Sequence, residues 1–383
     1  MTRLFRFVAD HHVALPVGAA IALLWANALP ASYFTTAERL SFAVNDVAMT
    51  LFFALMTREV IEASGPDGAL HTWRRLALAG VAAAGGALGA FAAYAACLSF
   101  RDERSVLLAA WPVVCATDLA FSYFLARSIC GERAVPFLVL VGIVSDVIAL
   151  VVLEVRHPVG EVHSAALALL MAAIAAAIVL RRCEVRSFWP YVLGAGTSSW
   201  LGLYWCGLHP ALALVPIVPF LPRTVKTRPF LHDAPARARD TLSRFQRAMR
   251  HPVHATVFLF GLVNAGVALR GADTGTWAIA VAALVGRPAG MAIAVAAAVA
   301  LGLRLPRHVG WREMTVLTIT SSTGFAFALF FATVIYPIGP VLAEIKLGAL
   351  STAGAAALAL AAARALRVGR FARIDALTPA SRA

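Results

Sequence analysis

The sequence predicts an all-α polytopic membrane protein with about twelve transmembrane helices, and three observations support this fold class. Hydrophobic residues make up 61% of the 383 positions and charged residues only 14%, whereas soluble domains are about half apolar and about one quarter charged. Apolar stretches of roughly 20 residues, enough to cross a bilayer, recur along the whole chain. Basic residues lie between these stretches and favour alternate loops. We therefore expect a single integral membrane transporter domain over residues 1–383, without a soluble domain.

The apolar stretches define the expected helices in order. The first begins near Val13 and continues past the length of a signal peptide, so it predicts a span. The seventh and eighth are short and meet near 207–210. The expected spans are 13–32, 42–63, 76–99, 105–127, 135–155, 163–180, 188–206, 208–221, 252–269, 275–303, 314–336 and 340–363.

The charges of the connecting segments predict the orientation. With twelve spans, Arg74 and Arg75 share one side with the basic stretch 223–251 and with the tail from Arg364 to Arg373. The opposite side holds few basic residues, so both termini are expected in the cytoplasm of a bacterial inner membrane. The formal charge of +13 then reflects topology, and we expect no nucleic-acid partner.

The longest polar stretch, 223–251, carries eight basic residues and only two acidic ones. It is either an ordinary cytoplasmic loop or a partly helical connector that lies on anionic lipid headgroups. The sequence alone leaves both interpretations open.

Cysteine spacing and motifs argue against an enzyme. The five cysteines have neither CxxC nor metal-site spacing, so we interpret them as free thiols packed like small hydrophobic residues. No nucleophile–base pair, metal cluster or phosphate-binding glycine loop is present in the sequence. We expect no enzymatic activity, no cofactor and no bound metal other than a transported ion.

Ionisable residues inside a span cost at least a few kcal/mol and therefore point to function. Asp118, Asp146 and Arg287 lie well away from the ends of their spans. Two deep carboxylates and one deep cation suit a small cation that must bind, lose its water and leave again. Asp46 and Glu59 lie nearer the ends of the second span, where capping or ion pairing explains them.

Two spans contain polar interruptions. The fourth carries a proline followed by Thr117 and Asp118, and the eleventh carries Ser321, Ser322, Thr323 and Gly324. Such patterns are typical of broken helices, whose exposed ends need a carboxylate near the positive ends and a cation near the negative ends. Asp118 and Arg287 suit these two roles. Alternatively, the hydroxyl groups only bond to their own helices.

The third span contains a GxxxG motif at Gly85 and Gly89. Close packing of two helices explains this motif fully. It requires no functional interpretation.

Several short motifs occur in an order that resembles the NhaA-type sodium/proton antiporter family almost from end to end. The most specific of them are Asn45-Asp46 and Ala116-Thr117-Asp118. Further matches are Gly207-Leu-His209-Pro, His251-Pro252, Asn264-Ala-Gly, Gly286-Arg-Pro, Gly324-Phe325 and Lys346-Leu-Gly348.

The resemblance implies a twelve-helix fold with inverted repeats, in which spans 4 and 11 are broken and cross at mid-membrane. It implies exchange of Na+ or Li+ for H+ by alternating access, for sodium and pH homeostasis. Asp146 would be the ion-binding and proton-exchanging carboxylate, with Asp118 and Thr117 beside it. It also places Glu59 and Glu62 at a cytoplasmic funnel, and His209 in a region linked to pH response.

The sequence departs from the family pattern in the helices that carry charge. The family has two adjacent aspartates in span 5, where this chain has Ser145-Asp146, and a lysine in span 10, where it has Arg287. Arginine effectively never loses its proton in proteins. We therefore expect a single exchangeable carboxylate, with Ser145 as a further ligand oxygen. One-for-one exchange that is insensitive to membrane voltage follows.

Two further departures concern regulation and assembly. Where the family tends to have a glutamate before the His-Pro pair, this chain has Arg247, Ala248, Met249 and Arg250, so its pH response is expected to differ. The segment 31–40 lacks the residues that form a β-hairpin arm in family members. A homodimer would lose that contact.

Two alternatives stay open. The missing aspartate and lysine are compatible with a transport-deficient family member that acts as a membrane scaffold or sensor. The same fold also suits another solute, such as an organic anion drawn to Arg287. Against the anion, Asp118 and Asp146 would repel it.

Overall fold

The computed structural model describes residues 14–63, 73–99, 104–131, 134–156, 163–223, 240–306 and 309–372, and all regular elements in these ranges are helical. Within these ranges, six helices are long and apolar enough to cross a membrane, or up to seven if one bent pair is a single span. The chain is therefore a multi-pass membrane protein of the all-α class. The count of twelve spans stays a prediction.

The chain divides into two compact units, each built from two separate stretches of sequence. The first unit comprises Met1–Gly68 and Leu153–Gly266, and the second comprises Ala69–Val152 and Val267–Ala383. Each unit has its own apolar core within the described residues.

In the first unit, close backbone contact joins the first described helix to a much later one. A Cβ at Gly18 would lie 2.3 Å from the carbonyl oxygen of Phe258, and one at Gly261 would lie 2.7 Å from that of Leu15. Only glycine permits this approach. The helices of the unit are α2 (Ala14–Ala28), α3 (Pro30–Phe42), η1 (Ala43–Ala48), α4 (Met49–Ala63), α10 (Ser164–Arg182), η3 (Pro190–Gly196), α11 (Thr197–Trp205) and α12 (Thr241–Asn264).

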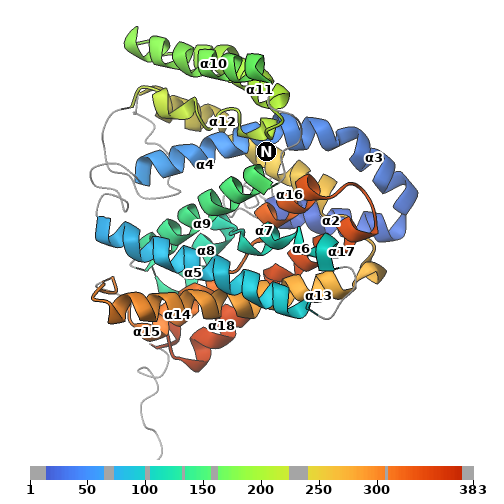
Figure 1. Cartoon of the computed structure of the whole chain (residues 1–383), viewed down its shortest axis with the longest axis vertical. Helices are drawn as coiled ribbons and strands as arrows, with labels where there is room; N and C mark the ends of the chain where they lie inside the picture. The colour runs from blue at the N-terminus through green and yellow to red at the C-terminus, as the bar shows by residue number, and fades with distance from the viewer. Residues whose placement is uncertain are drawn as a thin grey trace, which may run out of the picture. The chain divides into compact units, whose positions relative to one another are not determined.

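In the second unit, α5 (Trp73–Cys97) and α14 (Arg287–Ala300) lie side by side (Figure 1). A Cβ at Gly89 would lie 2.4 Å from the Gly286 carbonyl oxygen, so the close packing predicted from the GxxxG motif is confirmed. The other helices include α6 (Arg104–Leu108), α7 (Trp111–Cys115), α8 (Leu119–Cys130), α9 (Val135–Arg156), α13 (Thr274–Val281), η7 (Ala282–Gly286), α15 (Trp311–Thr320), α16 (Phe325–Ile335), α17 (Pro340–Ser351), η8 (Thr352–Gly354), α18 (Ala355–Ala365) and η9 (Gly369–Phe371).

The structure corrects the expected boundaries of the second and eighth spans. The helical backbone of the second span begins at Pro30, because α3, η1 and α4 follow one another without a break. The eighth window, 208–221, forms the 3₁₀ turns η4 (Pro210–Leu212) and η5 (Val218–Phe220) instead of an α-helix. Prolines at 210, 216 and 219 explain this, because each removes a backbone donor.

The polar stretch 223–251 is also shorter than predicted. Its last third belongs to α12, which begins at Thr241 and is capped by Asp240, whose carboxylate accepts from the Ser243 N–H at 3.1 Å. Leu242 and Phe245 are buried, so this part packs into the first unit. Residues 224–239 lie outside the described residues.

Candidate functional site

The helix predicted as span 4 is interrupted between α7 and α8. Ala116 and Asp118 have extended backbone, with ψ of 144° and 93°. Asp118 then begins α8, and its Oδ1 accepts from the Phe121 N–H at 3.1 Å. This is an ordinary N-cap, and it satisfies a donor that the helix itself leaves unpaired.

A second interruption separates α15 from α16, which are bent by 41° relative to each other. The two interruptions touch, because the Asp118 N–H donates to the Thr323 carbonyl oxygen at 2.5 Å. A Cβ at Gly324 would lie 2.8 Å from the Ala116 carbonyl oxygen, so only glycine allows this approach. The Ser122 and Thr323 hydroxyl oxygens lie 2.5 Å apart at the same place.

Two charged side chains lie at the helix ends that the two interruptions create. The Asp118 carboxylate caps α8 and also accepts from the Ala326 N–H, in the first turn of α16, at 3.4 Å. Arg287 donates to the Ala116 carbonyl oxygen, just past the C-terminal end of α7, and to the Thr117 hydroxyl. Each charge thus lies at the helix end of opposite partial charge.

Arg287 owes its position to a short π-helix. Its N–H donates to the Ala282 carbonyl oxygen, five residues back, at the end of η7. Pro288 follows and has no N–H to offer, which favours a local widening of the helix. Arg287 is 1% exposed, and its stem lies beside Gly86 of α5.

The predicted ion-binding carboxylate lies in α9, next to these helix ends. The Thr117 N–H donates to Asp146 Oδ1 at 3.1 Å. Asp146 Oδ2 and Ser145 Oγ are buried and have no hydrogen-bond partner among the described residues. Buried polar atoms are normally paired, so these two oxygens are suited to bind a proton or a hard cation, which prefers oxygen ligands.

Thr117 links the two opposite charges of this site. Its backbone N–H contacts Asp146, and its side-chain hydroxyl contacts Arg287. No ion pair joins Arg287 directly to Asp146, although both side chains are described. The Asp146 carboxylate therefore keeps one oxygen available.

The serines of the α15–α16 interruption have a different environment. Ser321 and Ser322 both donate from their hydroxyls to the Thr318 carbonyl oxygen, at 2.8 and 3.1 Å. The alternative that hydroxyls bond to their own helix therefore holds for these two residues. Thr323 differs, because it also contacts Ser122 across the two interruptions.

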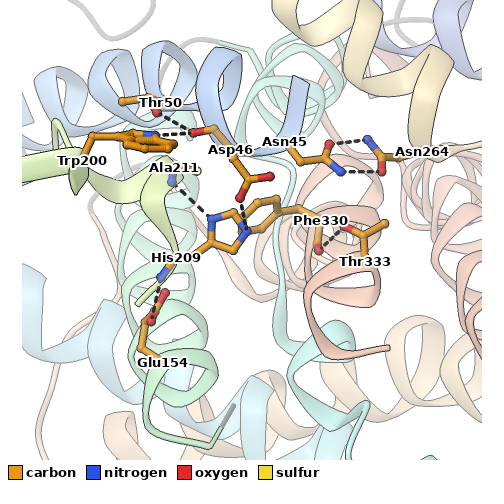
Figure 2. Close-up of polar contacts among 10 residues, drawn as sticks. All are labelled: Asn45, Asp46, Thr50, Glu154, Trp200, His209, Ala211, Asn264, Phe330 and Thr333. Atoms are coloured by element: carbon orange, nitrogen blue, oxygen red, sulfur yellow. Dashed lines mark hydrogen bonds and ion pairs between the residues drawn. The ribbon is translucent and has the colours of Figure 1, made fainter. Parts of the chain in front are cut away.

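The first unit holds a separate polar cluster (Figure 2). His209 Nδ1 accepts from the Ala211 N–H at 3.2 Å, which leaves Nε2 facing Asp46 Oδ1 at 3.9 Å. The His209 N–H donates to Glu154 Oε2 at 3.4 Å. Two acids thus lie on opposite sides of one buried histidine.

The helical element η1 positions Asp46 and its neighbour Asn45 in this cluster. The Asp46 carbonyl oxygen accepts from Trp200 Nε1 at 2.9 Å, and Asn45 exchanges hydrogen bonds with Asn264 (Figure 2). These contacts join η1 to α11 and α12 within the first unit.

The two acids predicted at a cytoplasmic funnel belong to α4. Glu59 is 6% exposed and forms an ion pair with the neighbouring Arg58. This agrees with the ion-pairing interpretation of Glu59. The side chain of Glu62 lies outside the described residues.

Comparison with known proteins identifies the family. A family model described as Na+/H+ antiporter 1 matches residues 7–363. A Na(+)/H(+) antiporter NhaA from Geobacter metallireducens is 34% identical and covers 97% of this chain and 100% of that protein. Another, from Geobacter sulfurreducens, is 33% identical with the same coverage. The chain belongs to the Na+/H+ antiporter 1 family. It is thus a multi-pass membrane protein of a transporter family.

Within this antiporter-family fold, the structure brings together most of the residues predicted for the ion site. Thr117, Asp118, Asp146 and Arg287 share the second unit and one network of contacts. Glu154 was missed, because a lone acid near the end of an apolar run and close to Arg156 gives no signal of its own.

Proposed function

We propose that this chain exchanges Na+, or Li+, for H+ across the bacterial inner membrane by alternating access. Both termini face the cytoplasm in this proposal, and the activity serves sodium and pH homeostasis. The observation that carries it is the buried Asp146 carboxylate, with one oxygen paired and the other available. The family membership and the names of the relatives support the choice of ions.

A proton and a sodium ion compete for the same carboxylate in this mechanism. The unpaired Asp146 Oδ2 accepts either one, and Ser145 Oγ supplies a further oxygen for the metal ion. Because a buried anion without a partner is costly, the site is expected to carry one of the two ions whenever it changes orientation. This obligatory loading produces exchange instead of a leak.

The fixed charges around Asp146 predict a one-for-one exchange. Arg287 stays protonated and is held by the end of α7, while Asp118 is held by two helix N-termini. Only Asp146 exchanges its bound ion, and one proton carries the same charge as one sodium ion. Both loaded forms therefore have equal net charge, and the membrane voltage does no work on the cycle.

Broken spans that cross at mid-membrane belong to the same proposal. The contacts between the α7–α8 and α15–α16 interruptions support it, because non-helical backbone is tolerated at membrane depth where protein surrounds it. Glu59 is assigned to the cytoplasmic funnel. His209, between Asp46 and Glu154, is assigned to the pH response.

The test uses purified protein in sealed liposomes that contain a pH-sensitive dye. Addition of Na+ or Li+ outside should drive protons out, with the membrane potential clamped at zero by K+ and valinomycin. Asp146→Asn removes the exchangeable proton with little change in shape, and we expect it to abolish the flux. Asp273→Asn is the matched control, because Asp273 is an exposed helix cap that asparagine can replace.

Voltage dependence then tests the stoichiometry. One uncompensated charge per cycle would shift the equilibrium ion ratio by about 50-fold per 100 mV. We expect no shift between zero and 100 mV. A shift of that size would refute the one-for-one mechanism, and exchange that survives in Asp146→Asn would refute the site. If Na+ and Li+ drive no proton flux through the unmodified protein at any pH, the scaffold or sensor alternative is favoured.

A further inference from the structure

The last described residues of the chain form a cationic cluster around one aromatic ring. The Arg370 guanidinium carbon lies 4.8 Å from the Phe371 ring centroid, and that of Arg364 lies 5.4 Å from it. Both arginines are exposed. Neither has an acidic partner within the described part of the chain. Contact with the ring holds both guanidinium groups in place and leaves their N–H donors available.

This segment is firmly docked on the protein. Gly369 has a φ of +58°, and a Cβ there would lie 1.8 Å from the Ile129 carbonyl oxygen, near the C-terminal end of α8. Val368 is buried in an apolar cluster with Ile129 and Val316, and Phe371 packs against it. The arginine pair therefore sits on a fixed base that includes α8 and α15.

An exposed apolar helix face leads directly to the arginines. Ala357, Leu358 and Ala361 of α18 are exposed, and Arg364 follows on the same face about one turn later. In a membrane protein such a face contacts acyl chains. A guanidinium group at its end is placed where a lipid headgroup lies. A ligand that fits both features has apolar chains and an anionic head, which free phosphate lacks.

We propose that Arg364, Arg370 and Phe371 form a binding site for the phosphate headgroup of an anionic phospholipid whose acyl chains lie along α18. Guanidinium groups bind phosphate oxygens by paired, charge-assisted hydrogen bonds. Because the same segment is docked on Ile129, the bound lipid stabilises the C-terminal end of α8. The N-terminal end of that helix is capped by Asp118, so the lipid supports a helix of the candidate ion site.

Native mass spectrometry of the full chain in detergent measures the binding, with phosphatidylglycerol as the probe. Arg364→Gln combined with Arg370→Gln should weaken it roughly 30-fold, since each basic residue near an anionic lipid contributes about a fivefold factor. The matched control is Arg182→Gln combined with Arg304→Gln, which removes the same charge from two exposed positions without an aromatic ring. It should change the affinity less than twofold.

Phe371→Ala keeps both charges but removes their common contact, and we expect an intermediate loss. Thermal unfolding with and without phosphatidylglycerol gives a second measurement, in which the lipid should raise the midpoint of the unmodified chain but not of the Arg364/Arg370 variant. Equal affinity in that variant and its control would refute the site. Competition by inorganic phosphate at the same concentration would also refute it, by identifying a simple anion site. Neither readout depends on transport.

Discussion

Replacement of Arg287 by alanine tests whether this residue is a fixed countercharge. Arg287 is 1% exposed, and its guanidinium donates to the Ala116 carbonyl oxygen and the Thr117 hydroxyl. Arg287→Ala leaves the C-terminal end of α7 without its cation. It also removes the positive charge that Thr117 links to the Asp146 carboxylate.

The expected cost follows from the two lost contacts. Hydrogen bonds to a charged group contribute about 1.5–3 kcal/mol each, and Arg287 donates two of them. We therefore expect a loss of roughly 3–6 kcal/mol in the free energy of unfolding. Combining Arg287→Ala with Asp146→Asn should recover part of this loss, because the second substitution removes the carboxylate that no longer has a positive charge near it.

Thiol labelling during heating measures this stability in detergent. All five cysteines are free, and Cys115 and Cys206 are buried, so their reaction with a thiol-specific dye reports unfolding. Arg304→Ala is the control at an exposed arginine after α14, where a change within about 0.5 kcal/mol is expected. If Arg287→Ala were no less stable than Arg304→Ala, or if Asp146→Asn made it worse, Arg287 would not be a countercharge.

Three further substitutions test the packing that shapes the two units. Gly324→Ala places a methyl group 2.8 Å from the Ala116 carbonyl oxygen. It should lower the Na+/H+ exchange rate of reconstituted protein at least tenfold, which corresponds to a rise of about 1.4 kcal/mol in the activation free energy. An unchanged rate would contradict contact between the interruptions. Gly89→Val forces α5 away from α14 and should lower the yield of folded protein in size-exclusion chromatography. Gly80→Val is the control, because a Cβ at Gly80 has no neighbouring atom within 4 Å outside the backbone of its own helix, and it should leave the yield unchanged. Tyr33→Phe leaves the buried Gly266 N–H without its acceptor and should cost about 1–3 kcal/mol in thermal unfolding.

The fold class and the helix interruptions could be predicted because they depend on local composition. Apolar length defines a membrane helix, and proline, glycine and hydroxyl residues mark places where a helix can end. The structure accordingly interrupts the helices at Ala116 and at Gly324. The eighth window was misjudged by the same reasoning, because its apolar character outweighed three closely spaced prolines that exclude a regular helix.

The start of α12 was missed for a different reason. Asp240 and Ser243 have the spacing of a helix N-cap, and apolar Leu242 and Phe245 follow among the basic residues. The count of charges left a loop and a partly helical connector both open, and it placed the start of the span at residue 252. An amphipathic interpretation of the same residues would have predicted the helix.

Contacts between distant residues could be predicted only in part. The charges at the half-helix ends suggested that Asp118 and Arg287 belong to one site, and the structure brings them together. The link through Thr117, and the π-helix before Pro288, depend on exact backbone geometry. Likewise, the contact of Glu154 with His209 joins residues 55 positions apart and leaves no trace in local sequence.

The two departures from the family pattern are best understood together. A second aspartate at position 145 would add a negative charge beside Asp146, and that charge would require a partner able to give up its own proton. Ser145 supplies an oxygen without a charge, and Arg287 supplies a charge without an exchangeable proton. Each residue suits a site in which Asp146 alone exchanges its bound ion. The serine removes one negative charge from the site, whereas the arginine keeps the positive charge of the lysine and removes only its exchangeable proton. Because both changes leave Asp146 as the group that exchanges an ion, we infer that the two residues act as a pair.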